Sequence, residues 1–218
     1  MPTTATTTLP ALALQAETLI TLGVAELAGI PVQQLRDMCR HDPAGPVLLA
    51  VHPELLAPSA LAPLIRRDGK PGFVVADMAD LDEFGPIPSV ALPDSPVYAV
   101  CAPDRGDAMA NWSPDEALPA IVGAGRTALT VSEGLHWVLQ QPDVLQRNRC
   151  FMTIGSRLPK HDGSLDARTP ALWISNGTGR DGAANRDAPK VGWCWAGNRH
   201  TWLGFASAAR RDVLSPPG

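Results

Sequence analysis

The chain changes its local character near Pro142, and this change limits the possible folds more than any other feature of the sequence. Before Pro142, apolar residues recur at helical spacing and helix start signals are present. After it, the segments CFMTIGSR, PALWISN and KVGWCWAGNRHTWLGFASA are rich in β-forming residues and are separated by loops of Gly, Asn and Asp. Such segments are typical of an antiparallel meander. The sequence therefore predicts an α+β fold, with N-terminal helices, a small α/β layer and a C-terminal antiparallel β-meander.

The distribution of small and polar residues predicts where the folded domain begins. Residues 1–12 are rich in Thr, Ala and Pro and contain little that could be buried, so we predict a disordered arm there. Residues 13–218 are long enough to bury a substantial core, and we predict a single compact α+β domain over this range. A sub-boundary is expected near residues 142–150, where the local pattern changes.

The N-terminal half predicts short elements interrupted by glycine and proline. Residues 14–39 have helical spacing with breaks at Gly23 and at Gly29 to Pro31, which indicates two or three short helices. A helix is expected from Glu54, between two apolar runs. Short apolar runs bounded by Pro or Gly predict strands at residues 46–51, 72–78 and 96–103.

Two helices in the middle of the chain have clear start signals. Ser113 stands where a helix cap belongs, with Glu116 three residues later, and Thr130 is followed by Glu133 at the same spacing. This spacing is typical of the capping box, in which the two side chains bond each other's backbone N–H groups. Both glutamates are therefore interpreted as capping groups rather than as catalytic acids.

The segment that begins at Val191, VGWCWAGNRHTWLGFASAA, predicts a β-hairpin. Two apolar flanks surround Gly197 and Asn198, which form a favourable turn pair. Alternation along the first flank places Trp193 and Trp195 on one face of the strand. Tryptophans in such a pattern serve more often as core or as a stacking platform than as cofactor partners.

Charge and motifs argue against nucleotide and nucleic-acid binding. The net charge is −4, with 7 Lys and Arg against 17 Asp and Glu up to Gln146, and 11 against 5 after it. Binding to nucleic acid needs a basic surface, so we expect no nucleic-acid partner. No GxxxxGK[ST] loop occurs, and the GTGRDG motif at Gly177 to Gly182 precedes a segment too short and polar for a dinucleotide-binding helix.

Cysteine and histidine spacing argues against a metal centre, and hydropathy argues against a membrane protein. The four cysteines are far apart, and neither a CxxC pair nor an HExxH motif occurs, so no metal and no cofactor are expected. No apolar run is long enough to cross a membrane, and the N-terminal residues lack the positive region of a signal peptide. We therefore expect a cytoplasmic protein without a membrane partner.

Two residues of the C-terminal segment are candidates for catalysis. His200 stands beside the predicted turn, and histidine is the side chain that changes its charge between pH 5 and 8. Cys194 could act as a nucleophile if a neighbouring cation lowered its pKa. The alternative for Cys194 is that of most free cysteines, which behave as small buried hydrophobic groups.

Polar residues and tryptophans near the ends of the C-terminal strands could bind a ligand. Arginine binds carboxylate and phosphate groups bidentately, and tryptophan offers a stacking face. The functional interpretation is a cleft for a polar, anionic small molecule, and the alternative is that the loop arginines pair with loop aspartates. The candidate ligand-binding residues are Arg157, Arg168, Asn176, Arg180, Asn198, Arg199, Trp195 and Trp202.

Three functions remain open on this evidence. We predict binding or transformation of a polar, anionic small molecule, with acid–base chemistry if the protein is an enzyme. The first alternative is a protein-interaction module that uses the tryptophan-bearing sheet as an interface, for example in a homodimer, because Trp and Arg are common interface anchors. The second alternative is single-stranded nucleic-acid binding through aromatic stacking.

Several longer motifs resemble a known family. MANWSPDEALPAI, the GR at Gly125 leading to LTVSEGL, CFMTIGSR, PALWISN and above all GWCWAGNRHTWLGFAS are similar to a family of uncharacterised actinobacterial proteins catalogued as a domain of unknown function. The similarity runs from about Leu19 to Ala208. It implies an actinobacterial cytoplasmic protein and carries over no activity.

Overall fold

Short helices form the N-terminal end of the protein. The computed structural model describes residues 9–215, with the backbone alone described at Arg180. Of the predicted arm, residues 1–8 lie outside the described residues, whereas Leu12 is buried and begins the first helix. The helices are α1 (Leu12–Thr21), α2 (Val24–Leu27) and α3 (Val32–Met38), and the predicted break between α1 and α2 occurs at Gly23.

A three-stranded antiparallel sheet packs beside these helices. Its order is β1 (Val47–Val51), β6 (Val97–Cys101) and β14 (Arg210–Val213), so the first and last strands of the chain lie on either side of β6. Every residue of β1 and β6 is buried. Continuous burial agrees with the apolar runs from which both strands were predicted.

Side chains satisfy the backbone groups at the free edge of β1. The Gln15 amide donates to the carbonyl of Val47 at 2.7 Å and accepts from the N–H of Leu49 at 2.8 Å. The N–H of Val51 donates to Nε2 of His136 at 3.3 Å. Burial lowers the pKa of His136 to about 4, so the ring is neutral and can accept this hydrogen bond. These two side chains take the place of a neighbouring strand.

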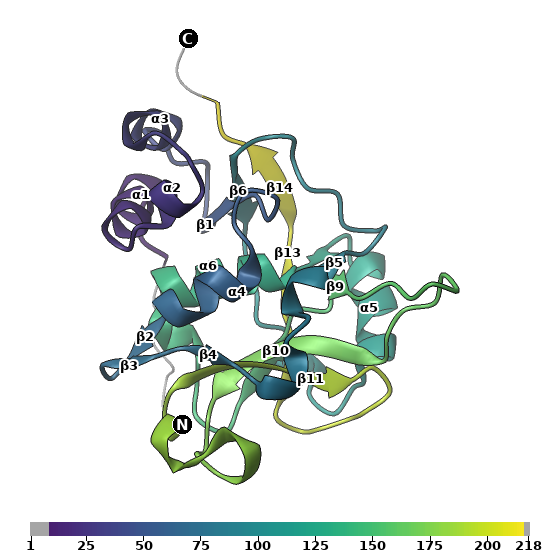
Figure 1. Ribbon diagram of the computed structural model, residues 1–218. Coiled ribbons are helices and arrows are strands. Elements are labelled where there is room, and N and C mark those ends of the chain that lie inside the picture. Colours follow the sequence, from purple (N-terminus) through teal and green to yellow (C-terminus); the bar gives the residue numbers. More distant parts are fainter. Residues whose placement is uncertain (1–8, 216–218) are drawn as a thin grey trace, which may run out of the picture.

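The central helix α6 (Val131–Gln140) lies between the three-stranded sheet and a larger sheet below it (Figure 1). All ten of its residues are buried, including Glu133 and His136. Gly134 permits the close packing, because a Cβ at this position would lie 2.5 Å from Cγ2 of Thr153 and 3.1 Å from Cδ1 of Leu172. The short helix α4 (Pro58–Leu61) lies beside α6.

The larger sheet has five strands in the order β12-β8-β10-β11-β4. Its three central strands, β8, β10 and β11, are antiparallel, as predicted for the C-terminal segment. The two outer strands pair in parallel, and β4 comes from the N-terminal half of the chain. The predicted α+β fold is confirmed, with a mixed sheet in place of a simple meander. The strands are β4 (Phe73–Val74), β8 (Cys150–Met152), β10 (Arg168–Ile174), β11 (Pro189–Trp195) and β12 (Leu203–Phe205).

The predicted hairpin around Gly197 and Asn198 is wrong. Strand β11 pairs with β10 and β4, whereas β12 pairs with β8 at the other side of the sheet. Residues 196–202 therefore cross the positions of β10 and β8 instead of turning back beside β11. The turn pair and the apolar flanks are local signals, and they do not show which strand each flank will find as its partner.

The two faces of the five-stranded sheet are covered differently. One face carries Phe151, Leu172 and Val191 and joins the main core with α6. The other face packs part of its surface against α5 (Pro114–Gly123), which contributes Ala117 and Ile121 to a second apolar cluster. Both predicted capping boxes are confirmed, at the first residues of α5 and of α6.

The remaining elements are short. Within the described residues, no helix is long and apolar enough to cross a membrane. The other strands are β2 (Arg66–Arg67), β3 (Lys70–Pro71), β5 (Gly85–Pro86), β7 (Thr127–Ala128), β9 (Ser156–Arg157) and β13 (Ser207–Ala208). The 3-10 helices are η1 (Ala62–Leu64), η2 (Ala76–Met78), η3 (Leu81–Glu83), η4 (Asp107–Met109), η5 (Pro142–Val144), η6 (Gly179–Asp181) and η7 (Ala183–Asn185).

Candidate functional site

A cavity of about 410 Å³ opens on the sheet face that α5 covers only in part. Its base consists of β-strand residues, and its rim comes from the segment 196–202 and from the residues before β8. Such a volume lies within the usual range of small-molecule sites. We call it the His200 pocket, and it is lined by Asn148, Arg149, Cys150, Ala171, Trp173, Ile174, Asn176, Trp193, Cys194, His200, Trp202 and Leu203.

Backbone hydrogen bonds hold the segment 196–202 in place over the sheet. The N–H of Ala196 donates to the carbonyl of Ala167, and the carbonyl of Ala196 accepts from the N–H of Asp115 at the start of α5. The carbonyl of His200 accepts from the N–H of Asn111 at 3.0 Å. Because two separate parts of the chain, residues 111–115 and Ala167, fix this segment, the imidazole of His200 is presented from a defined backbone.

Aromatic side chains shape the walls of the pocket. The imidazole of His200 stacks on the indole of Trp202, with 4.6 Å between ring centroids and 17° between planes. Trp202 is 52% exposed, so much of its indole surface is open to a ligand. Trp173 lies across the neighbouring Gly192, where a Cβ would approach its Cζ3 and Cη2 atoms within 3.2 Å and 2.6 Å. A planar group could therefore stack on Trp202 or on Trp173.

Cys194 lines the pocket as a thiol rather than as an activated nucleophile. Burial raises its pKa, and hydrogen bonds from the backbone of Trp195 and from the side chain of Asn198 lower it by less. The shift upward leaves the thiol protonated at neutral pH, and the thiolate is the nucleophilic form. Asn198 is thus placed next to the pocket through its contact with Cys194.

The predicted arginines whose side chains are described, Arg157, Arg168 and Arg199, are not among the residues that line this pocket. Arg157 donates to the backbone carbonyl of Asp166 at 2.7 Å, and Arg199 pairs with Glu116 at the start of α5. The side chain of Arg180 lies outside the described residues. The alternative considered from the sequence was that the arginines pair with acidic residues of the protein. Arg199 and Arg168 both do so.

Arg168 joins the first residue of β10 to the segment that follows β4. Its guanidinium binds both carboxylate oxygens of Asp80, at 3.0 and 2.6 Å, and Asp166 at 3.1 Å. Hydrogen bonds from Arg168 are the main cause that lowers the pKa of both Asp80 and Asp166. The side chain also lies over the ring of Phe84, 5.2 Å from its centroid. Arg168 is therefore a structural clamp.

This clamp predicts a pH dependence of stability. Because the pKa of Asp80 and of Asp166 is lower in the folded than in the unfolded protein, the stabilisation is complete above their ordinary pKa of about 4. It is lost as the pH falls through their folded values. We expect the parent protein to lose stability below about pH 4 and Arg168→Met to show a shallower loss there. Urea denaturation at a series of pH values measures both, and identical profiles would contradict the prediction.

The structure places four of the predicted residues in the pocket and leaves others outside it. Trp195 is 47% exposed and packs edge-on against Trp193, at 4.5 Å between centroids. The pocket residues that the sequence interpretation missed include Trp173 and Arg149, which lie in PALWISN and in the RNRC sequence that leads into β8. The four predicted residues that line the pocket are His200, Cys194, Asn176 and Trp202.

Among the described residues, no group of three or more His, Cys, Asp or Glu side chains is placed so that it could hold a metal ion. Among the described lining residues, Arg149 is the one side chain with a permanent positive charge, and His200 lies in the same lining.

Comparisons with known proteins give one match. A family model described as "Family of unknown function (DUF5701)" matches residues 18–214. No curated protein and no solved structure matches the chain. The family match confirms the resemblance predicted from the C-terminal motif, whereas the actinobacterial source stays a prediction.

Proposed function

The chain belongs to the DUF5701 family of unknown function, and we propose that it binds a small anionic molecule with a planar ring in the His200 pocket. The observation that carries this proposal is the combination of residues in one cavity. Its described lining includes three tryptophans and, within that lining, Arg149 is the one permanently charged side chain. No Asp or Glu is among the described lining residues, so an anion meets no like charge on the walls.

Arg149 is well placed to receive the anionic group. Its side chain is 55% exposed, and its contact with Asp107 is long, at 3.4 Å. An exposed ion pair of this length contributes little, so the guanidinium can turn to a ligand at small cost. Asn148 and Asn176 add amide groups at the same cavity. We propose that the ring stacks on Trp202 or Trp173 while the anion bonds Arg149.

Transformation of the ligand is the less supported part of the proposal. A thiol with a raised pKa does not favour covalent catalysis by Cys194. His200 is the side chain that proton transfer would use, and its ring is held against Trp202. We therefore propose binding as the primary function and acid–base chemistry at His200 as its extension.

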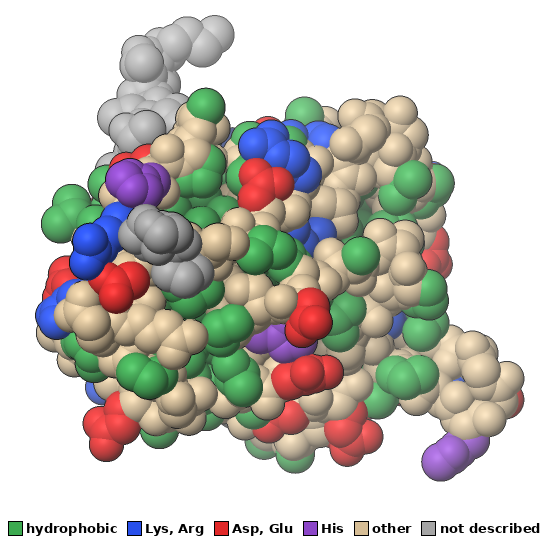
Figure 2. Space-filling view, turned by 90° about the horizontal axis from the view of Figure 1, so that it is seen from above, with side chains coloured by type: hydrophobic (Ala, Val, Ile, Leu, Met, Phe, Trp, Pro, Cys, Tyr) green, Lys and Arg blue, Asp and Glu red, His purple; other side chains and the backbone are tan. Residues whose placement is uncertain are grey.

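One observation favours a second candidate function, a protein interface. Trp112, Trp195 and Trp202 are 41%, 47% and 52% exposed, and all three lie on or beside the segment 196–202. Exposed tryptophans are frequent anchors of interfaces, including those of homodimers. For nucleic acid the support is weaker, since Figure 2 shows acidic and basic side chains interspersed over one face of the described protein.

Matched arginine variants test the ligand proposal. Indole-3-acetate and benzoate serve as ring carboxylates, and benzyl alcohol and benzylamine as neutral and cationic counterparts, in thermal-shift and calorimetric titrations. We expect a carboxylate to bind, and Arg149→Met to weaken it at least tenfold because the charge-assisted hydrogen bond is lost. Arg147→Met is the control, since Arg147 lies two residues away, is 48% exposed and pairs with Asp187 outside the pocket.

The titrations and a measurement of the oligomeric state together decide between ligand binding and a protein interface. Trp202→Ala should also weaken the carboxylate, because it removes a stacking surface. If no ring carboxylate binds, or if Arg149→Met and Arg147→Met bind it equally well, the ligand proposal is wrong. A concentration-dependent dimer that Trp195→Ala dissociates would then support the interface.

A further inference from the structure

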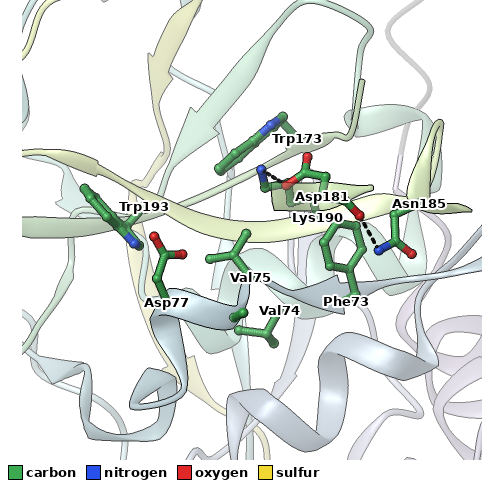
Figure 3. Close-up of a pocket in the computed structure, with 10 residues that line it drawn as sticks. Phe73, Val74, Val75, Asp77, Trp173, Asp181, Asn185, Lys190 and Trp193 are labelled. Carbon is green, nitrogen blue, oxygen red and sulfur yellow. Dashed lines mark hydrogen bonds and ion pairs between the residues drawn. The ribbon is translucent and has the colours of Figure 1, made fainter. Parts of the chain in front are cut away.

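Two buried cations of this protein have close acidic partners. Figure 3 shows Lys190 of β11 in a second cavity, of about 310 Å³, where its ammonium donates to Asp181 at 2.6 Å. The side chains of Lys190 and Asp181 are only 13% and 11% exposed. Arg211 is buried more deeply still, and its Nε lies 2.5 Å from Glu133 Oε1. Removing a cation from water is costly, so a buried cation without such a partner needs a physical explanation.

Arg105 is a buried cation whose acidic partner is more distant. Its side chain is 10% exposed and lies over the ring of Phe151, 5.8 Å from the centroid. Its Nη1 donates to the carbonyl of Val144. Nη2 lies 3.4 Å from Asp107 Oδ1, and neither Nη2 nor Nε donates a hydrogen bond within the described part of the chain. Burial lowers the pKa of Arg105, and the charge of Asp107 offsets this only in part.

Asp107 is shared between Arg105 and the pocket residue Arg149. Its Oδ2 lies 3.4 Å from Nη1 of Arg149, which equals the distance from its Oδ1 to Arg105. Hydrogen bonds between a guanidinium and a carboxylate are usually about 2.7–2.9 Å long, so neither arginine holds Asp107 firmly. The side chain of Asp107 is 37% exposed and lies against β12, where a Cβ on Gly204 would be 2.8 Å from its Oδ1. The carboxylate therefore lies between a buried arginine and the arginine that lines the His200 pocket.

We propose that Arg105 is a positioning residue, which takes over the carboxylate of Asp107 when Arg149 binds an anionic ligand. This inference rests on the proposed function of the His200 pocket and describes how Arg149 is released for it. The ligand anion repels the carboxylate of Asp107, which moves toward Nε and Nη2 of Arg105. These two donors then gain an acceptor, and a buried donor without one is unfavourable. Arg105 thus favours the bound state although it is not among the described residues that line the pocket.

Removing the shared carboxylate tests the first step of this exchange. Asp107→Asn should bind indole-3-acetate about threefold more tightly than the parent in calorimetric titrations, because an exposed acidic competitor for Arg149 is lost. Asp187→Asn is the matched control, since Asp187 is also 37% exposed and pairs with Arg147, two residues from Arg149. Unchanged or weaker affinity in Asp107→Asn, or an equal gain in Asp187→Asn, would refute the proposal.

A double-mutant cycle tests the role of Arg105. Arg105→Met should weaken indole-3-acetate about fivefold, because Asp107 then stays with Arg149. Arg157→Met should leave the affinity unchanged: Arg157 is also 10% exposed with a buried Nε that lacks an acceptor among the described residues, and it does not line the pocket. In the Asp107→Asn background, Arg105→Met should have no effect, because no carboxylate remains to be taken over. Equal effects in both backgrounds would show that Arg105 acts through its own charge and would contradict the exchange.

Nuclear magnetic resonance of the arginine side chains observes the second step directly, even if circular dichroism shows that Arg105→Met does not fold. Saturation of the parent with indole-3-acetate should shift the Nε–H signal of Arg105, as a new hydrogen bond to Asp107 requires. The signal of Arg157 should not shift, and that of Arg105 should not shift in Asp107→Asn. An Arg105 signal that is the same with and without bound ligand in the parent would overturn the proposal.

The same measurements separate this inference from the proposed function. If the parent binds no ring carboxylate, both are wrong. If the parent binds one and Arg149→Met weakens it, while Asp107→Asn and Arg105→Met bind as the parent does, the proposed function stands and the exchange is wrong.

Discussion

Replacing Arg211 by methionine should lower the free energy of unfolding by about 3–5 kcal/mol, because it leaves the carboxylate of Glu133 buried without its cation. The side chains of Arg211 and Glu133 are 4% and 0% exposed. Arg211 binds both oxygens of Glu133, at 2.5 and 2.7 Å, and also donates to the hydroxyl of Thr127. Chemical denaturation of the parent and the variant measures the difference.

The neighbouring residue provides a matched control. Arg210 also pairs with an acidic residue, Asp212, but its side chain is 59% exposed. Arg210→Met should therefore change stability by at most about 1 kcal/mol, as is usual for surface ion pairs. The double variant Glu133→Gln/Arg211→Met should be more stable than Arg211→Met alone, since it buries no unpaired charge. Equal losses in Arg210→Met and Arg211→Met would show that burial does not govern this pair.

The same glutamate shows what local sequence can and cannot predict. The spacing of Thr130 and Glu133 predicted a capping box, and both of its hydrogen bonds are present at the start of α6. The second role of Glu133, as the partner of Arg211, depends on a residue 78 positions later in the chain. Capping is decided within one helical turn, whereas the ion pair exists only after β14 has joined the three-stranded sheet.

For the strands too, the local sequence predicted where a strand lies but not which strand it pairs with. Residues 46–51 and 96–103 were predicted as strands from short apolar runs, and β1 and β6 lie within these ranges. The pairing of the C-terminal strands was not predictable in this way. Gly197 and Asn198 are good turn residues, yet β12 finds its partner in β8 and not in β11. Register and strand order depend on which buried faces meet in three dimensions.

The candidate sites depend even more on tertiary structure. His200 and Trp202 were identified because histidine and tryptophan are chemically versatile, and their pocket depends on the crossover of residues 196–202. Arg149 has no motif around it that separates it from other loop arginines. Arg168 and Arg199 have the same chemistry as Arg149, and they differ from it in having firm acidic partners.

Because Phe151 is buried and Trp195 is exposed, we expect the smaller Phe151 to contribute more to stability than Trp195. A pair of alanine variants tests this. Phe151→Ala should cost about 3–5 kcal/mol of stability, the usual range for a buried phenylalanine. Phe151 is fully buried beneath α6 and packs against Trp137, with 5.7 Å between ring centroids. Trp195 is the larger side chain and would be expected to cost as much if the segment around it formed the core.

Trp195 is instead 47% exposed at the end of β11 and contacts Trp193 edge-on. Its replacement by alanine should therefore cost about 1 kcal/mol, the value of an aromatic pair outside the core. Thermal and urea denaturation of the two variants give the comparison directly. If Trp195→Ala were as destabilising as Phe151→Ala, Trp195 would be packed in the protein in solution, against either another segment of the chain or a second copy. Concentration-dependent stability of the parent would identify the second copy, because only association makes the unfolding midpoint depend on protein concentration.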